Sequence, residues 1–366
     1  MKTDILFLLL RLGLGLSSVE DENTDCLKAL PIEDWVELMN FALEQGVDAI
    51  VMDGIQRVYD DIPDFSSVLD TPEGENYKYD WLGLALGLEN ENEQQISVIK
   101  DMSAKWNAAG YPMLLFKGQA NGLFYPNPLH RPTGDIDCYL FGHFDGGNNL
   151  AEAVGASVNT DWYKHSQIHY RGETFENHQF FVHTREGKRS KDLEQLLLNT
   201  LKNVEFDHLP GTDALLPPPM FNALFLTYHA LTHFLEEGLR LKQLIDWAMF
   251  LHRDAARVDW PQFYSICEKY HLRRFADVTT DIAVHRLGIQ LENSQITTSS
   301  PYSTRVIHST LTDNDYVFNS GQSGWSNRWH IVRNLIKYRW KYHQIYQHSV
   351  LRQIWYYTTG YLFKTE

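Results

Sequence analysis

The chain has 366 residues, of which 43% are hydrophobic, and a formal net charge of −15 at pH 7. This length predicts two or three lobes with real hydrophobic cores, and no run approaches the roughly 20 apolar residues that a membrane span needs. The acidic balance argues against nonspecific binding to nucleic acid, which requires clustered Lys and Arg. The three cysteines, Cys26, Cys138 and Cys267, are too far apart for a metal-ligand motif and are typical of a reducing, cytoplasmic compartment.

Residues 1–95 are predicted to form an N-terminal helical region. The first 18 residues superficially resemble a secretory signal, but Asp4 and Arg11 interrupt the apolar run. Their leucines and isoleucine instead fall near one face of a helix, which predicts ordinary packing by Ile5, Leu8, Leu9, Leu12 and Leu16.

Helical periodicity continues towards the first strand. Apolar residues around Trp35 repeat at helical spacing, and Gly46 is expected to end this helix. The acidic segment 60–92 is mixed and polar, which predicts a loop with one short helix. A further helix is expected over residues 93–109, and the Gly-Tyr-Pro sequence that follows ends it.

The next stretch contains the residues with the clearest chemistry. Residues 113–116 predict a strand, and Lys117 and Gly118 follow at a strand-to-helix junction, where backbone N–H groups and a cation suit a phosphate. A second predicted strand carries Asp135 and Asp137, whose i,i+2 spacing places both carboxylates on one face. Like charges this close repel each other, so the pair makes sense if a cation lies between them. Oxygen ligands suit Mg²⁺ or Mn²⁺, and metal carboxylates beside a phosphate site indicate transfer of a phosphorus centre.

A hairpin-like region follows this stretch. Residues 142–149 predict a turn, and residues 150–158 predict a helix. The segments 162–171 and 174–184 are rich in aromatic and β-favouring residues, with Gly172 between them, so they are predicted to pair as two strands.

The second arm of this hairpin offers a third carboxylate. Strand alternation places Glu176 and His178 on one face and Phe175 and Asn177 on the other. Glu176 is therefore a candidate third ligand of a two-metal site, and its alternative is an exposed strand carboxylate. His178 is open to three interpretations: it orients Glu176, contacts a nucleotide or caps the strand.

Beyond residue 210 the pattern is helical. A helix over 190–201 with Ser190 as its N-cap closes the strand-rich region, and three consecutive prolines at 217–219 mark a boundary. Further helices are predicted over 219–236, 239–253, 259–271 and 273–288, a loop over 290–326, and a final helix or helix pair over 327–360.

The second helical region contains two histidines at i,i+4, His229 and His233, which share a helix face. That spacing can bind a transition metal, but the glutamate of the zinc-protease pattern is missing. Packed or nucleotide-facing histidines are the favoured interpretation.

The C-terminal residues 326–366 differ in charge from the rest of the chain. They hold seven Lys and Arg against the single acid Glu366, a net charge of +6, together with many aromatic residues. Such a segment can bind single-stranded nucleic acid or a membrane surface. The favoured alternative is docking on the helical region, because five apolar residues fall at helical spacing: Ile331, Leu335, Tyr338, Tyr342 and Ile345.

The spacing of these motifs resembles the signature of the uncharacterised nucleotidyltransferase family of the polymerase-β-like superfamily. Lys-Gly, Tyr-Pro, Arg and Gly-Asp-x-Asp blocks occur in the family's order at Lys117-Gly118, Tyr125-Pro126, Arg131 and Gly134-Asp135-Ile136-Asp137-Cys138. The resemblance covers roughly residues 105–255. The chain departs from the wider superfamily, which uses Gly-Ser where Lys-Gly stands here, and Asn177 occupies a position that is usually apolar in the family.

The resemblance implies an α+β fold, with a small mixed-sheet nucleotidyltransferase core at 96–210 flanked by helical regions at 1–95 and 211–366. It implies a metal-dependent nucleotidyltransferase that moves an NMP group from an NTP to an unidentified acceptor and releases pyrophosphate. Mg²⁺ or Mn²⁺ would be held by the catalytic residues Asp135, Asp137 and Glu176. The nucleotide would be bound by Lys117, Gly118, Arg131, Gly134, His178, Arg240 and Lys242.

Several alternatives stay open beside this interpretation. The alternative role of Arg131 is a salt bridge within the loop. The alternative for Arg240 and Lys242 is that they lie on a solvated helix face without a role in binding. The acceptor is a small molecule or a protein side chain, and RNA ends are disfavoured by the acidic balance. The rival function is a catalytically inactive nucleotide-binding or protein-interaction module of the same fold.

Overall fold

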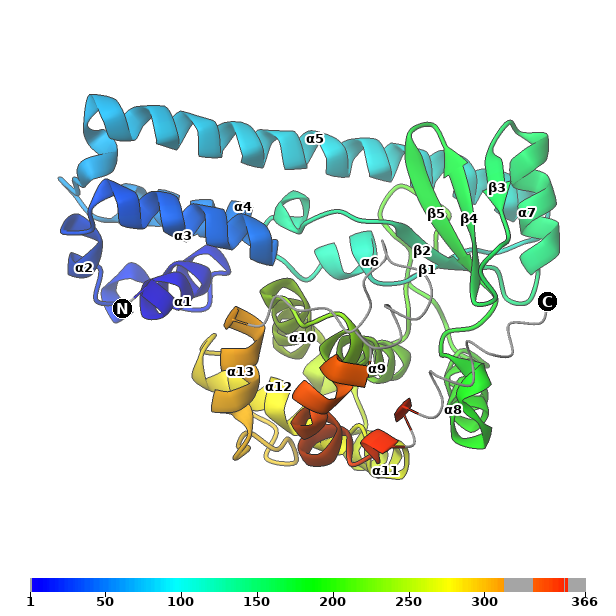
Figure 1. The fold of residues 1–366 in the computed structure, drawn as a ribbon. Coiled ribbons are helices and arrows are strands. Elements are labelled where there is room, and N and C mark those ends of the chain that lie inside the picture. The colour runs from blue at the N-terminus through cyan, green and yellow to red at the C-terminus, as the bar shows by residue number, and fades with distance from the viewer. Residues whose placement is uncertain (1, 313–331, 352, 355–366) are drawn as a thin grey trace.

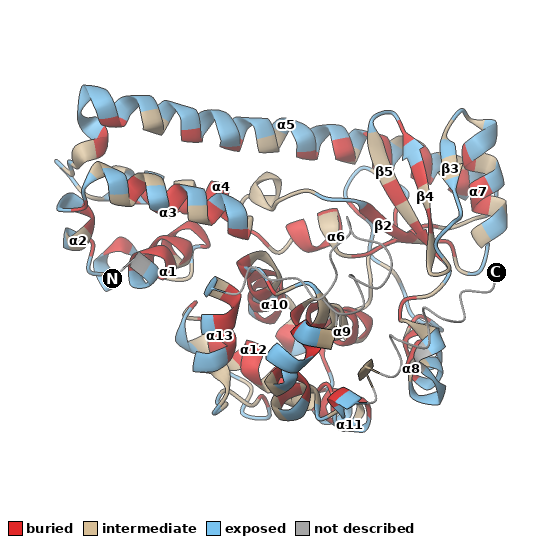
Figure 2. Ribbon diagram, in the orientation of Figure 1, coloured by how far each residue is buried: buried red, intermediate tan, exposed pale blue. Residues whose placement is uncertain are grey.

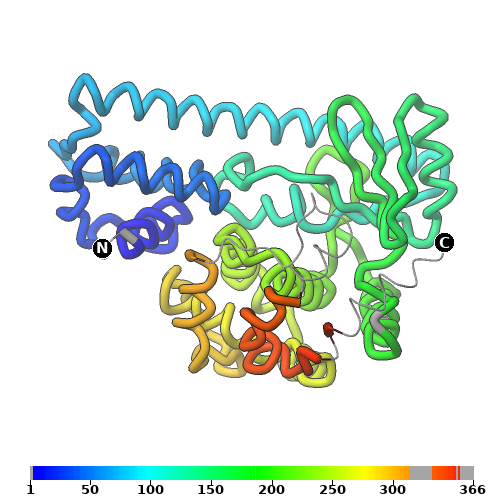
Figure 3. The backbone as a smooth tube through the Cα atoms, in the orientation of Figure 1, coloured from blue at the N-terminus to red at the C-terminus, as the bar shows by residue number. Residues whose placement is uncertain are grey.

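The structure is a computed structural model that describes residues 2–312, 332–351, 353 and 354 of the chain. Figure 3 shows the chain passing from the N-terminal helices along one long helix to the sheet, and from there into the C-terminal helices. The N-terminal region contains α1 (Lys2–Gly13), α2 (Asp25–Lys28), α3 (Ile32–Gln45), α4 (Asp48–Asp61) and α5 (Pro72–Ala108), with 3₁₀ turns at Val19–Asp21 and Val68–Asp70.

Helix α1 is buried on nearly every side and not only on the one face predicted (Figure 2). Four of the five expected packing residues, Ile5, Leu8, Leu9 and Leu12, lie in the core, whereas Leu16 follows the helix and is partly buried. It crosses α4 closely at two glycines. A Cβ on Gly13 would lie 2.0 Å from the carbonyl oxygen of Ile50, so no larger residue fits this crossing.

The prediction of a loop over 60–92 is wrong for most of that segment, because the residues from Pro72 onward belong to α5, one helix of 37 residues. Thr71 caps it by accepting a hydrogen bond from the Gly74 N–H, and Pro72 occupies its first turn. The segment looks loop-like because α5 exposes most of its surface, as Figure 2 shows. The helix also runs without a break through residues 95 and 96, where a boundary between regions was expected.

A five-stranded mixed sheet forms the centre of the strand-rich region, which confirms the α+β prediction. Its order is β1-β2-β5-β4-β3, with β2 and β5 parallel and the other neighbours antiparallel. Arg171 and Gly172 both have positive φ in the tight turn of the predicted hairpin β4–β5. The strands are β1 (Leu114–Leu115), β2 (Ile136–Tyr139), β3 (Ser157–Asn159), β4 (His165–Tyr170) and β5 (Glu173–His178).

Helix α7 (Phe144–Ala153) replaces the turn predicted at 142–149, and the predicted helix at 150–158 is therefore displaced. Two glycines in this helix, Gly146 and Gly147, serve close packing. A Cβ on Gly147 would lie 2.0 Å from Cδ1 of Leu140, so glycine lets the helix approach β2. The end of α5 packs on the same hydrophobic cluster, which Trp106 shares with Phe175 of β5.

The C-terminal helices cover the other side of the sheet (Figure 1). Phe116, which follows β1, connects the two parts because its ring packs against Phe181, Phe221 and Phe225. These helices are α8 (Lys188–Thr200), α9 (Pro219–Glu236), α10 (Leu241–Asp254), α11 (Trp260–Tyr270), α12 (Arg273–His285) and α13 (Ser303–Thr312), followed by a π-helical turn, η6 (Lys341–Tyr346).

Two predictions for this region are wrong. Helix α8 begins after Gly187, so Ser190 lies inside it and is not the N-cap. Part of the predicted loop at 290–326 is α13, whose Ser- and Thr-rich sequence hides a buried face that includes Val306 and Ile307. Residues 313–326 lie outside the part of the chain that the structure describes.

The docking prediction for the C-terminal segment is confirmed within residues 332–351. Leu335, Tyr338, Tyr342 and Ile345 are buried. The Tyr342 hydroxyl donates to the Leu235 carbonyl of α9 at 3.4 Å, and Arg274 of α12 donates to the Gln344 carbonyl at 2.8 Å. Ile331 and residues 355–366 lie outside the described residues. No helix within the described ranges is long and apolar enough to cross a membrane.

Candidate active site

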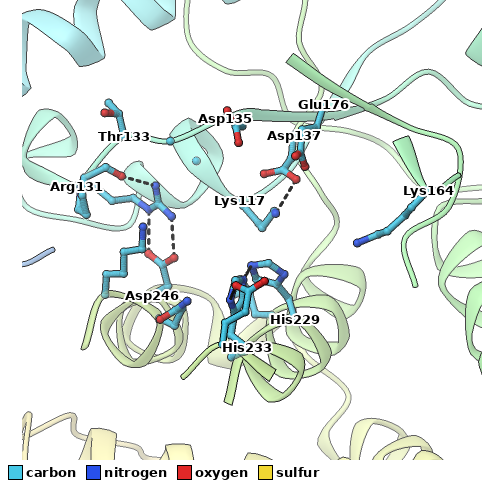
Figure 4. A pocket seen from close by; sticks show the side chains of 18 residues that line it. Lys117, Arg131, Thr133, Asp135, Asp137, Lys164, Glu176, His229, His233 and Asp246 are labelled. Atoms are coloured by element: carbon cyan, nitrogen blue, oxygen red, sulfur yellow. Dashed lines mark hydrogen bonds and ion pairs between the residues drawn. The ribbon is translucent and has the colours of Figure 1, made fainter. Parts of the chain in front are cut away.

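A cavity of about 460 Å³ lies between the sheet and helices α9 and α10 (Figure 4). One side, called the sheet wall below, comes from the segments around the strands: Lys117, Gly118, residues 131–135, Asp137, Lys164 and Glu176. The opposite side, the helix wall, is formed by Leu226, His229, Ala230, His233, Glu237, Lys242, Gln243 and Asp246.

Strand register brings the carboxylates of the sheet wall together. Asp137 on β2 is the parallel neighbour of Glu176 on β5, and Asp135 stands immediately before β2. The alternation of the hairpin agrees with this arrangement, because Asn177 points to the other face and donates to Asn148 of α7. All three carboxylates therefore face one cavity, as the i,i+2 spacing predicts.

Asp137 is the most heavily partnered of the three carboxylates. Its Oδ1 lies 2.6 Å from Nζ of Lys117 and 2.9 Å from Nε2 of His178, and the residue is only 5% exposed. Burial alone would raise the pKa of Asp137, but Lys117 and His178 hold it well below its usual range. His178 is itself buried behind Asp137, where its Nδ1 donates to the Phe180 carbonyl at 3.2 Å.

Asp135 is exposed and has no hydrogen-bond or ion-pair partner among the described residues. Burial of part of its carboxyl raises the pKa of Asp135, and the charges of Glu176 and Asp137 raise it further. Glu176 lies between two imidazoles, 3.2 Å from Nε2 of His165 and 3.4 Å from Nε2 of His178. Burial opposes the ionisation of Glu176, but the hydrogen bond from His178 and the charges of His165 and His178 together lower its pKa.

These carboxylates fit a hard divalent cation by their chemistry. Lys117 offsets part of the charge at Asp137, and the charge of Asp135 is left without any partner among the described residues. A cation shared with Asp135 would relieve this repulsion. A second group of ligand-type side chains overlaps the first, since His165, Glu176 and His178 have ligand atoms within 4.8 Å of one another.

The backbone is strained at Lys117, the residue that leads into α6 (Gly118–Gly122). Lys117 has φ 60° and ψ −146°, a conformation that costs a non-glycine residue about 1–3 kcal/mol. Gly118 follows with φ 37°, and both residues line the cavity. The aromatic cluster around Phe116 fixes the preceding residue, so packing maintains the strain beside Asp137.

Helix α5 positions the loop that leads into β2. The buried amide of Asn92 donates to the Leu129 carbonyl at 2.7 Å, and that of Gln95 donates to the Gly134 carbonyl at 2.8 Å. Asn92 is part of the reason why the segment 60–92 looks loop-like in the sequence, although its side chain is buried. The loop carries Arg131 and Gly134 to the cavity.

Arg131 connects the two walls. It donates from Nε and Nη2 to the two carboxylate oxygens of Asp246 at 2.9 and 2.8 Å, and the Tyr125 hydroxyl donates to the same carboxylate at 2.7 Å. Burial alone would lower the pKa of Arg131, but the charge of Asp246 raises it. The salt bridge that was the alternative role for Arg131 is therefore present, and Arg131 also lines the cavity.

The cavity contains most of the predicted site residues, but not all of them. Those that line it are Lys117, Gly118, Arg131, Gly134, Asp135, Asp137, Glu176 and Lys242. His178 does not line it and acts through Asp137 and Glu176. Arg240 precedes α10, is exposed, and is not part of either wall.

Sequence reasoning missed several lining residues. Lys164, before β4, has no hydrogen-bond or ion-pair partner for its ammonium among the described residues, and burial followed by the charge of Lys117 lowers the pKa of Lys164. No local pattern marks this lysine. His229 and His233 did show their shared helix face, and both line the cavity, as the nucleotide-facing interpretation requires.

The comparisons with known proteins give one result. A family model described as an uncharacterised nucleotidyltransferase matches residues 31–288, which include both walls of the cavity. No curated protein and no solved structure matches the chain.

Proposed function

This chain belongs to the uncharacterised nucleotidyltransferase family, and on that basis we propose that its cavity transfers an NMP group from an NTP to an acceptor and releases pyrophosphate. The observation that carries the proposal is the arrangement of Asp135, Asp137 and Glu176. Asp137 and Glu176 stand on neighbouring parallel strands, Asp135 immediately precedes the first of them, and all three face one cavity. Asp135 lacks any partner among the described residues.

Asp135, Asp137 and Glu176 are the residues that would hold divalent cations in this reaction. Bound Mg²⁺ or Mn²⁺ would lower the pKa of an attacking acceptor group and neutralise charge on the leaving pyrophosphate. His178 keeps Asp137 and Glu176 in place through its Nε2, because both carboxylates lie within 3.4 Å of that atom. Its role is positioning.

The charges that line the cavity support a nucleotide that binds together with divalent cations. Its lining contains four basic side chains, Lys117, Arg131, Lys164 and Lys242, against five carboxylates. A triphosphate would meet net repulsion there, and accompanying divalent cations would reverse the balance.

Lys164 and Lys242 are the side chains best suited to hold the phosphates. Neither ammonium has an ion-pair or hydrogen-bond partner within the described part of the chain, and burial lowers the pKa of both. An unpartnered, partly buried cation is costly in the free protein, and a polyanion would remove that cost. Lys117 and the Gly118 amide would contact the phosphates nearest to the carboxylates.

A screen of the four NTPs with Mg²⁺ or Mn²⁺ tests the proposal, with pyrophosphate release measured across a library of small-molecule and protein acceptors. We expect release with at least one pair of NTP and acceptor, and none after chelation by EDTA. Release that persists in EDTA would contradict the metal-dependent mechanism. NTP binding without release from any acceptor would favour the inactive nucleotide-binding module.

A further inference from the structure

A hydrogen-bonded chain of three side chains runs along the helix wall. His229 and His233 stand on successive turns of α9, with their Nε2 atoms 3.1 Å apart. Nδ1 of His233 lies 2.8 Å from Oε2 of Glu237, and the Glu237 side chain is 54% exposed. All three residues line the cavity (Figure 4 labels the two histidines), so the chain leads from the reaction space to its rim.

The hydrogen bonds fix where the protons lie. A carboxylate only accepts, so Nδ1–H of His233 donates to Glu237. The Nε2 of a neutral His233 then carries a lone pair and accepts from Nε2–H of His229. A neutral His229 is left with an unprotonated Nδ1, and no described residue makes a hydrogen bond to that nitrogen.

The surroundings of His229 keep it neutral. Its ring stacks on Phe225 at 5.7 Å, and burial holds the pKa of His229 well below its usual value. The charged and titratable groups that face it are Lys117 before α6, Lys164 before β4, His178 on β5 and His233 on its own helix, and all of them oppose a positive charge there. A histidine in this position is a poor base if the proton must stay on its ring.

The hydrogen-bonded chain of His229, His233 and Glu237 removes that difficulty. A proton that arrives at Nδ1 of His229 allows the Nε2 proton to move to Nε2 of His233. The positive charge then rests on His233, beside the carboxylate of Glu237, and away from Phe225. Glu237 is thus placed to stabilise the charge that the partly buried ring of His229 cannot hold.

We infer that His229 is the proton acceptor for the acceptor's hydroxyl group, with His233 and Glu237 as its relay. This inference rests on the proposed function. In the step, the acceptor O–H bond breaks, its oxygen bonds to the α-phosphorus, and the bond from that phosphorus to pyrophosphate breaks. The proton goes to His229 Nδ1, and the Nε2 proton of His229 goes to His233. The acceptor class is therefore an alcohol or phenol, because a phosphate acceptor is already ionised and needs no base.

The tautomers can be measured without any turnover. Nitrogen-15 spectra of the full chain with labelled histidine, assigned by loss of signals in His229→Gln and His233→Gln, report the protonation of each ring nitrogen. Near neutral pH we expect an unprotonated Nδ1 and a protonated Nε2 for His229, and the opposite pair for His233. A His229 protonated at Nδ1 in the free protein would overturn the relay.

Turnover gives the second test once an NTP and an acceptor are known. His229→Gln should lower kcat about 10²–10⁴-fold, the usual contribution of a general base, with little change in KM for the NTP. Glu237→Gln should cost less, because it removes only the carboxylate that stabilises the charge on His233. The exposed His252 on α10 supplies the control, since His252→Gln should leave kcat unchanged.

Imidazole added to His229→Gly should restore part of the lost rate, which a purely structural role would not allow. Full activity in His229→Gln would overturn the inference while leaving the proposed function intact. Absence of turnover in the wild type would instead count against the proposed function, and the tautomer measurement would still decide on the relay.

Discussion

The two walls of the cavity are built by different means. The sheet wall takes Asp137 and Glu176 from adjacent strands, so backbone register alone places their side chains together. The helix wall takes His229 from α9, which packs on Phe116 through Phe225, and Asp246 from α10, which packs on Phe124 through Phe250. The sheet wall therefore depends on local backbone geometry, whereas the helix wall depends on how well the core is packed.

The largest effect is expected when the sheet wall loses a carboxylate, in the variant Asp137→Asn. We expect pyrophosphate release to fall about 10²–10³-fold or more, the scale for removing one group that stabilises transition-state charge. The variant should also lose about 3–5 kcal/mol of stability, because Lys117 then lacks its buried counter-charge. Pyrophosphate release and urea unfolding measure the two effects, and unchanged turnover in a folded variant would refute a catalytic Asp137.

The bridge between the walls should show a comparable loss of stability. Arg131→Met leaves Asp246 buried without its bidentate partner, at a cost of about 3–5 kcal/mol in the free energy of unfolding. Asp246→Leu in the same background should recover much of this loss, because the pair is then replaced by apolar groups. A double-mutant cycle by urea unfolding measures the coupling, and additive losses would mean that the bridge does not hold the walls together.

Lys164 tests whether an unpartnered cation of the sheet wall serves the nucleotide. Lys164→Met should weaken NTP binding about tenfold or more, since a charge-assisted hydrogen bond contributes about 1.5–3 kcal/mol. Its stability at neutral pH should stay the same or rise, because burial disfavours the charged lysine. Calorimetry of NTP binding checks this, with the exposed Lys269→Met as the control. Equal affinity in wild type and Lys164→Met would exclude a phosphate contact.

Asp135→Asn should have the smallest effect on stability. It should raise stability at neutral pH, whereas Asp137→Asn lowers it. The folded-state pKa of Asp135 is raised, so the wild type has its full stability below the ordinary carboxyl pKa and loses stability as pH rises through the folded value. With EDTA present, Asp135→Asn should match the wild type at about pH 3 and exceed it at about pH 7. Solvent screening limits the gain to less than about 1 kcal/mol. A neutral-pH loss in thermal unfolding experiments would show that Asp135 is not repelled.

The sequence could predict the three carboxylates of the sheet wall because their signals are local, whereas no such signal marks Lys164. The i,i+2 spacing of Asp135 and Asp137 and the alternation around Glu176 survive in any strand, whatever packs on it. The strand-to-helix junction added Lys117 and Gly118, which line the cavity as expected.

The helix wall could not be predicted in the same way. Asp246 looks like any polar residue on a helix until its partner Arg131, 115 residues away, is brought to it. His229 and His233 show a shared face, but the same spacing serves packing equally well. The first part of helix α5 was hidden for a related reason, since its buried Asn92 binds a loop carbonyl and looks exposed in the sequence.

The central claim is that the three carboxylates of the sheet wall bind the cations of nucleotidyl transfer. Anomalous diffraction from crystals grown with Mn²⁺ and a non-hydrolysable NTP analogue tests it most directly. We predict manganese within coordination distance, about 2–2.6 Å, of Asp135, Asp137 and Glu176, with the phosphates beside Lys164. Manganese bound only by His165, Glu176 and His178, or an analogue bound outside the cavity, would contradict the account.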